Sequence, residues 1–135
     1  MKVLIDTNII LDVLYAREPF AEDASKIFKC CELKRIYGYV SALSIPNIVY
    51  VMRKEMDRKK IRQLLETLTG ILSIAELRET DLMKAAECDI EDYEDAIQCA
   101  CAARIKVDFI VTRDLKDFKN CSIPAVRPSE LLERL

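Results

Sequence analysis

A short apolar run near the start of the chain stops abruptly at a carboxylate. Residues 3–5 are Val, Leu and Ile, which predict a short strand buried on both faces, and Asp6, Thr7 and Asn8 follow with no turn residue between. Asp6 would then stand at the carboxyl end of a strand, where open α/β sheets bind ligands. The same residues also fit a helix start, in which Thr7 or Asn8 is the cap and Asp6 lies near the positive end of the helix dipole.

The length and composition indicate one globular domain over residues 1–135. The chain is 51% hydrophobic and 33% charged, and its net charge of −2 does not by itself indicate a nucleic-acid partner. No apolar run approaches 18 residues, and the apolar run after Lys2 is too short for a signal peptide. We therefore expect a cytoplasmic protein that does not associate with membranes.

The chain contains no histidine, which excludes several hydrolytic mechanisms. Ser–His hydrolases, Cys–His proteases and two-histidine ribonucleases all need an imidazole that titrates near neutral pH. Acid–base chemistry must then come from carboxylates, a lysine, or water on a metal ion. The six cysteines show no zinc-binding spacing: Cys30 and Cys31 are adjacent, and Cys99 and Cys101 lie in an alanine-rich run. We interpret them as free thiols in a reducing compartment.

Apolar periodicity predicts helices and strands that alternate along the chain. Such alternation favours a parallel sheet covered by helices on both faces. The first and fourth strands would be neighbours, so that their carboxyl ends, Asp6 and Asp114, meet. The expected strands are 3–5, 36–40, 71–74, 108–111 and 125–126. The expected helices are 9–15, one opened by Pro19, one capped by Ser44, one from Asp57 to Gly70, one from Thr80 or Asp81 to Ala86, one over the run 96–103, and one opened by Pro128.

Carboxylates stand beside a predicted buried element at three places. These are Asp6 after the first strand, Asp95 at the start of the buried helix, and Asp114 with Asp117 after the fourth strand. Helix capping is the alternative, because Asp92 and Asp95 have capping-box spacing, and so do the last two. If the acids lie together, burial and mutual repulsion would raise their pKa values unless a cation neutralises them. An all-oxygen site of this kind suits Mg²⁺ or Mn²⁺.

Three segments together resemble the PIN domain, and most closely its bacterial VapC-like branch. They are Leu-Ile-Asp-Thr-Asn at 4–8, Tyr-Glu-Asp-Ala at 93–96, and Ile-Val-Thr-Arg-Asp-Leu-Lys-Asp-Phe at 110–118. The resemblance implies a three-layer α/β/α sandwich with five parallel strands in the order 3-2-1-4-5. It also implies a metal-dependent ribonuclease, which in many members is the toxin of a toxin–antitoxin pair.

By position, the resemblance assigns a role to eight residues. It makes Asp6, Asp95 and Asp114 the ligands of Mg²⁺ or Mn²⁺ and adds Asp117 as a further catalytic acid. Supporting or substrate-binding roles fall to Asn8, Asn47, Thr112 and Arg113. There is one departure, because PIN domains usually carry a glutamate where this chain has Asn47. An amide brings no charge, so the sequence leaves open whether one or two ions bind.

The leading hypothesis is an endoribonuclease that cleaves RNA phosphodiester bonds with metal-activated water. Its expected partners are RNA, an antitoxin protein and a second copy of the chain. Asn47 motivates an alternative, a PIN-fold module with weak or no catalysis that binds RNA or protein. A phosphatase of the haloacid-dehalogenase kind, with Asp6 as nucleophile, is less favoured because Asn8 replaces the second aspartate of that motif.

A basic segment lies between residues 53 and 62, with six lysines and arginines against two acids. Such residues contact RNA phosphates in many complexes, although these contacts do not read the base sequence. The same pattern also fits the solvent-exposed face of an amphipathic helix. The apolar helices between residues 43 and 68 allow a dimer contact or a groove for an antitoxin peptide equally well.

Overall fold

The computed structural model describes residues 1–135 and contains one five-stranded sheet. All four strand pairings are parallel, and the strand order is β3-β2-β1-β4-β5, which confirms the expected topology. β1 occupies the centre, between β2 and β4. The strands are β1 (Lys2–Ile5), β2 (Tyr37–Ser41), β3 (Ser73–Ala75), β4 (Phe109–Val111) and β5 (Ala125–Val126).

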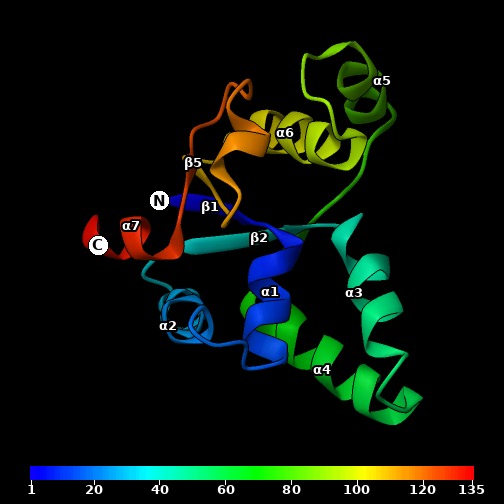
Figure 1. The fold of residues 1–135 in the computed structure, drawn as a ribbon, viewed down its shortest axis with the longest axis vertical. Helices are drawn as coiled ribbons and strands as arrows, with labels where there is room; N and C mark the ends of the chain where they lie inside the picture. Colours follow the sequence, from blue (N-terminus) through cyan, green and yellow to red (C-terminus); the bar gives the residue numbers. More distant parts are fainter.

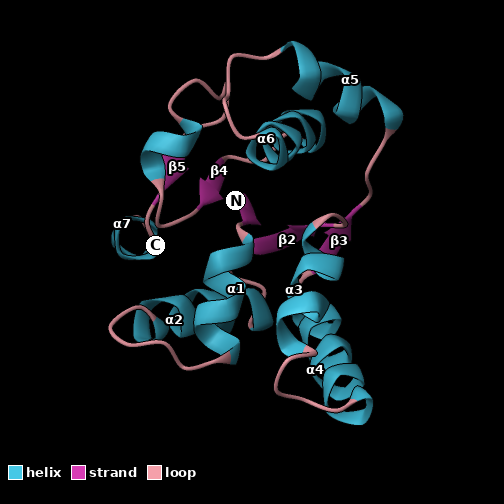
Figure 2. Ribbon diagram, turned by 45° about the vertical axis from the view of Figure 1, so that its right-hand side comes forward, coloured by secondary structure: helices cyan, strands magenta, loops and turns pink.

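Helices cover both faces of the sheet, as expected for a three-layer sandwich (Figure 1, Figure 2). The helices are α1 (Thr7–Leu14), α2 (Ala21–Glu32), α3 (Ser44–Met52), α4 (Arg58–Ile71), α5 (Glu79–Glu87), α6 (Tyr93–Ile105) and α7 (Pro128–Glu133), with a short 3₁₀ helix η1 (Leu115–Phe118). Helices α1 to α4 lie on one side of the sheet, with α7 beside α2, and α5 and α6 lie on the other. None of these helices is both long and apolar enough to cross a membrane.

The central strand is buried on both faces. Val3, Leu4 and Ile5 are fully buried, which confirms the interpretation of the first apolar run. Val3 and Ile5 belong to the larger core cluster, whereas Leu4 packs on the opposite face with Ile110. The sheet therefore holds the carboxyl ends of β1 and β4 side by side, at the positions where Asp6 and Asp114 follow.

The helix caps are partly as predicted. Asp57 and Asp92 cap α4 and α6, each accepting a hydrogen bond from the backbone N–H three residues on, at 2.8 and 3.0 Å. The predicted cap at Ser44 is wrong, because Ser44 is the first residue of α3 and its hydroxyl accepts a hydrogen bond from Thr7 (2.8 Å). Gly70 does not end α4 either, since the helix runs one residue further.

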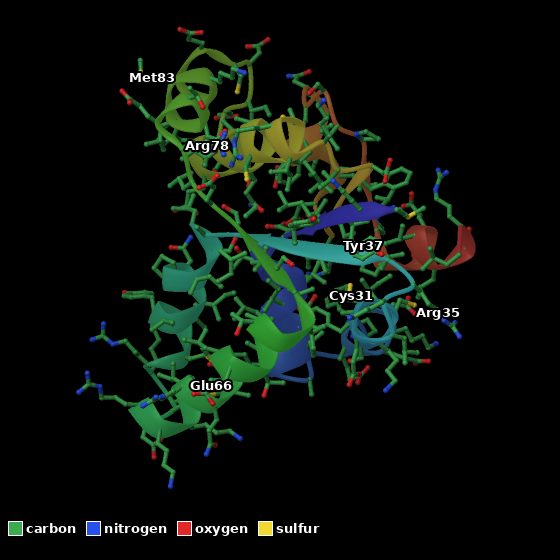
Figure 3. The ribbon with its side chains drawn as sticks, turned by 180° about the vertical axis from the view of Figure 1, so that it is seen from behind. Cys31, Arg35, Tyr37, Glu66, Arg78 and Met83 are labelled. Atoms are coloured by element: carbon green, nitrogen blue, oxygen red, sulfur yellow. A yellow bond between two sulfur atoms is a disulfide. The ribbon has the colours of Figure 1, made fainter.

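A glycine is required where β2 crosses α2. A Cβ atom placed on Gly38 would stand 2.6 Å from both Cys31 Sγ and Leu72 Cδ2. Cys31 lies on α2 next to the β2 residue Tyr37 (Figure 3). Both contacting side chains are buried, so neither has room to withdraw.

The expectation of six free thiols is wrong for two cysteines. Cys99 of α6 and Cys121, in the loop after η1, form a disulfide with an S–S distance of 2.15 Å, while the other four are free. The two are 22 residues apart with no motif between them, so only the packing of η1 against α6 brings them together. Burial raises the pKa of the free Cys31 thiol to about 12, which makes it unreactive.

Candidate functional site

The four predicted acids line one pocket of about 400 Å³ at the carboxyl edge of the sheet. Asp6 follows β1, and Asp114 follows the neighbouring β4. Asp95 comes from the first turn of α6, and Asp117 comes from η1. Asp114 makes no side-chain capping bond to η1, so the capping alternative does not account for its carboxylate.

Asp6 is buried, with 6% of its surface exposed, and neutral donors hold its carboxylate. The Thr112 hydroxyl donates to Oδ2 at 2.8 Å, and the Gln98 amide donates to Oδ1 at 3.1 Å. The Thr112 hydroxyl also accepts the backbone N–H of Asp114 at 3.1 Å, which links the ends of β1 and β4. Burial raises the pKa of Asp6, with a smaller contribution from Asp114, although the hydrogen bonds from Gln98 and Thr112 oppose the rise.

The pKa of Asp95 is raised strongly by its surroundings. Burial, followed by repulsion from Asp92, Asp6, Asp117 and Asp114, raises its pKa to about 7. Its ordinary value is 3.8. The ionised form of the Asp95 carboxylate is therefore disfavoured at neutral pH, and a bound cation would stabilise it.

Sequence reasoning missed several polar residues that line the pocket, among them Gln98, Glu94 and Asp92. Gln98 is 4% exposed, and its Oε1 accepts no hydrogen bond. The sequence did indicate a role for Gln98 in the site, because Gln98 lies three residues after Asp95 on the same helix face and is the one polar side chain in an apolar run. Asp92 was considered only as a cap, a role that it does fill.

Two of the four predicted supporting residues line the pocket from α1 and α3. Asn8 belongs to the first turn of α1, and Asn47 projects from α3. The Asn47 Nδ2 donates to Glu94 Oε2 at 3.3 Å, and Glu94 also lines the pocket. A carboxylate from α6 thus stands beside the position where the family pattern has an acid.

Arg113, the last predicted supporting residue, does not line the pocket. Its guanidinium instead donates to both carboxylate oxygens of Asp12, at 2.8 and 3.2 Å, and lies 4.0 Å from the centre of the Phe20 ring. Asp12 is fully buried, which explains why the arginine turns toward it. Arg113 therefore ties the end of β4 to α1.

The donor atoms of the pocket suit a hard divalent cation. All of its side-chain ligand candidates are oxygens, and no lysine or arginine lines the pocket. No three acids are close enough to one another to form a compact metal cluster. Mg²⁺ keeps several water molecules and binds through one or two carboxylates, so a compact cluster is not required. The unpartnered Gln98 Oε1 is a further acceptor for such a water.

Comparison with known proteins connects this geometry to a family. The family model described as "PIN domain" matches residues 2–116. Similar solved structures are a chain of VapBC2 from Rickettsia felis bound to a promoter DNA fragment (TM-score 0.74, 15% identity, 94% of this chain and 98% of that one) and a chain of VapBC from Salmonella typhimurium bound to DNA (0.72, 14%, 95% and 98%). FitAcB from Neisseria gonorrhoeae is also similar (0.70, 20%, 94% and 98%). The comparison with curated proteins gave no match.

Proposed function

The chain belongs to the PIN domain family of nucleases, and on this premise we propose that it is a divalent-metal-dependent endoribonuclease. The observation that carries the proposal is the convergence of Asp6, Asp95, Asp114 and Asp117 in one pocket that contains no cationic side chain. Separate helix caps would not need to converge. A site for a divalent cation does need such convergence.

In the proposed mechanism, Asp6, Asp95 and Asp114 would hold Mg²⁺ or Mn²⁺, with one or two of the carboxylates in direct contact and the rest bound through water molecules. When bound, the cation supplies an activated water and neutralises charge on the scissile phosphate. Thr112 and Gln98 fix the orientation of the Asp6 carboxylate through their hydrogen bonds. Asp117, which also lines the pocket, would orient the attacking water.

Asn47 and Glu94 bear on the number of ions. Asn47 adds no charge to the pocket, and its amide N–H₂ group is directed at the Glu94 carboxylate. We infer that Glu94 supplies the negative charge that Asn47 lacks, on the side of the pocket formed by α3. A Glu94→Gln variant should then reduce the number of Mn²⁺ ions bound, or weaken the weaker site, in a calorimetric titration.

Cleavage assays with matched controls test the nuclease proposal. A structured RNA should be cut by the protein with Mg²⁺ or Mn²⁺, and cleavage should stop with EDTA or in the Asp6→Asn variant. Asp23→Asn removes a charge from the surface of α2 and should leave cleavage unchanged. Cleavage that survives both EDTA and Asp6→Asn would reject the mechanism.

A second candidate function is a PIN-fold module that binds RNA or protein with little catalysis. The uncharged Asn47 in the pocket favours it, because one fewer carboxylate weakens cation binding. Titration with Mn²⁺ separates the two functions. Binding weaker than about 1 mM would favour the binding module, since ordinary metal concentrations would not fill such a site.

We also propose an antitoxin protein and a second copy of the chain as partners. Several similar structures belong to VapBC or FitAB assemblies, some of them bound to DNA, and this supports an assembly of comparable kind here. Light scattering of the purified chain tests the dimer. Co-expression with a neighbouring small open reading frame, followed by purification, tests the antitoxin.

A further inference from the structure

Three hollows lie in a row along α3, and shared residues connect them. Tyr50 lines both the acid pocket and a small hollow that it forms with Arg53 and Lys54. Arg53 in turn lines both that hollow and a groove of about 760 Å³ between α3 and α4. A continuous path therefore leaves the acid pocket over α3 and enters the groove.

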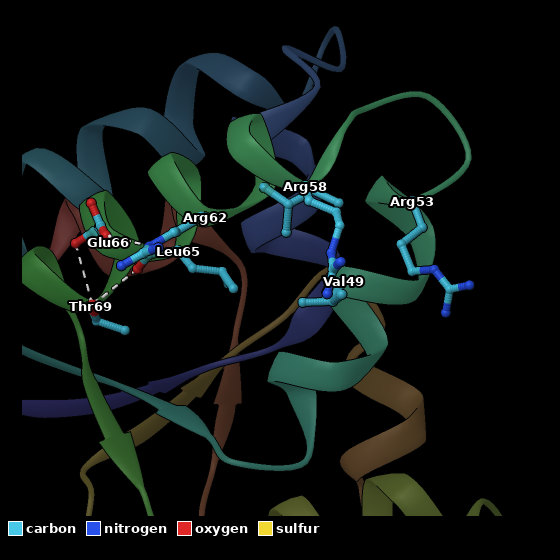
Figure 4. A pocket seen from close by; sticks show the side chains of 8 residues that line it. Val49, Arg53, Arg58, Arg62, Leu65, Glu66 and Thr69 are labelled. Carbon is cyan, nitrogen blue, oxygen red and sulfur yellow. Dashed lines mark hydrogen bonds and ion pairs between the residues drawn. The ribbon is translucent and has the colours of Figure 1, made fainter.

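The path carries positive charge that the acid pocket lacks. Arg53 and Arg58 line the groove and form no ion pair, whereas Arg62 pairs with Glu66 at 3.3 Å. Figure 4 shows Arg53 extending from α3 and Arg58 reaching from α4 toward Val49. Glu66 is the one acid among the groove residues, and it is already paired. The free cations are thus available to an anionic ligand.

An aromatic ring and an apolar floor complete the path. The Tyr50 side chain is 64% exposed, and Lys54 Nζ lies 5.2 Å from its ring centre. The floor of the groove consists of Val49, Ile61 and Leu65. Single-stranded nucleic acids bind to surfaces of this kind, because bases stack on aromatic rings while basic side chains contact the phosphates. A double helix presents no base faces to such a ring.

Resting on the proposed ribonuclease activity, we propose that single-stranded RNA follows this path from the acid pocket. One base stacks on Tyr50, and the phosphates beyond it contact Arg53, Arg58 and Lys54. The opposite rim of the pocket suits RNA less well, because its lysines stand among the acids Asp89, Glu91 and Asp92. The substrate would leave the pocket on the α3 side.

The test compares two charge reversals on the same turn of α4. Arg58→Glu alters the groove, whereas Lys60→Glu makes the same change in charge on the same helical turn, outside the groove. The probe is a fluorescein-labelled 12-nucleotide polyuridine RNA, titrated by fluorescence anisotropy in the Asp6→Asn background to prevent cleavage. Circular dichroism checks that each exposed-site variant is folded.

Arg58→Glu should weaken RNA binding about tenfold and reduce the slope of log K against log salt by about 0.7 or more, since one phosphate contact is lost. Tyr50→Ala should weaken binding about tenfold, and Tyr50→Phe should retain the affinity because stacking needs only the ring. Lys60→Glu should stay within about twofold of the parent. In the cleaving protein, Arg58→Glu should raise KM and leave kcat unchanged.

Equal RNA affinities of Arg58→Glu and Lys60→Glu would overturn the proposal and assign the groove to another occupant, such as an acidic segment of a protein partner. An unchanged affinity of Tyr50→Ala would also overturn it. Failure of the nuclease proposal is recognised separately. In that case the parent protein cuts no RNA with Mg²⁺ or Mn²⁺, while binding still responds to Arg58 and Tyr50 and the path itself stands.

Discussion

Replacing Asp95 with asparagine should stabilise the metal-free protein. The Asp95 carboxylate is partly buried and repelled by Asp92, Asp6, Asp117 and Asp114, and its pKa is raised to about 7. No hydrogen bond to its side-chain oxygens would be lost, because its backbone N–H makes the contact with Asp92. An amide of the same shape removes the repulsion. The variant should also lose the stabilisation that Mg²⁺ gives to the parent.

The size of the effect follows from the pKa. A folded-state value of about 7 against an ordinary value of 3.8 lowers the free energy of unfolding by about 4 kcal/mol at alkaline pH. Asp95 is partly exposed, so solvent screening reduces this to about 2 kcal/mol, or about 6 °C in Tm. Because the folded-state pKa is raised, stability is complete below the unfolded value and is lost as the pH rises to about 7. The difference between the variant and the parent therefore opens between about pH 4 and 7 and stays constant above.

Urea denaturation in EDTA across pH 4 to 8 would measure this difference. Asp23→Asn, in the first turn of α2, is the control and should alter stability by less than about 1 kcal/mol at every pH, which is the usual size of a helix-dipole effect. Two results would refute the electrostatic reasoning. One is an Asp95→Asn protein less stable than the parent at pH 8, and the other is a difference that does not change with pH.

Further predictions concern packing, ion pairing and metal binding. Gly38→Ala should lower the free energy of unfolding by about 2 kcal/mol in urea denaturation, because its Cβ would stand 2.6 Å from two buried side chains. Gly70→Ala, inside α4 with no atom within 4 Å of its Cβ, should raise it by about 0.5 kcal/mol. Arg113→Ala should lower it by about 2 kcal/mol, because the fully buried Asp12 loses both hydrogen bonds from Arg113 and keeps only the ion pair with Arg17 at 3.8 Å, and a loss below about 0.5 kcal/mol would contradict this. Mg²⁺ at a hundred times its Kd should add about 2.7 kcal/mol to the parent and much less to Asp6→Asn, as measured by thermal denaturation.

The sheet could be predicted from the sequence because the central strands are uninterrupted apolar runs that fit few structures other than buried strands. The runs at 3–5 and 109–111 are apolar without interruption, and both are followed at once by polar residues. Short apolar runs of this kind, separated by amphipathic helices, permit few arrangements other than a covered parallel sheet. The convergence of Asp6 and Asp114 then follows from the pairing of β1 with β4.

The remaining features depend on contacts that local patterns do not encode. The Cys99–Cys121 disulfide needs η1 to pack on α6, and nothing in the segment between the two cysteines, which are 22 positions apart, indicates that contact. The resemblance gave Arg113 a supporting role, yet Arg113 lies in the loop after β4 and donates to Asp12 instead. Glu94 was not predicted as a site residue, since only the fold brings its carboxylate to Asn47.

The buried carboxylates of the protein have two kinds of partner, arginines or neutral hydrogen-bond donors. Asp12 and Asp81 have 0% and 1% of their surface exposed, and an arginine donates to each, Arg113 at 2.8 Å and Arg104 at 3.0 Å. Asp6 is nearly as buried, at 6%, but only neutral donors contact it, and no arginine or lysine lines its pocket. Two buried acids are thus neutralised by cations of the chain itself, whereas Asp6 has no such partner and lies among further acids, which is the environment in which an external cation would be stabilised. This contrast within one molecule, together with the raised pKa of Asp95, is the physical reason to expect a divalent ion at the end of β1.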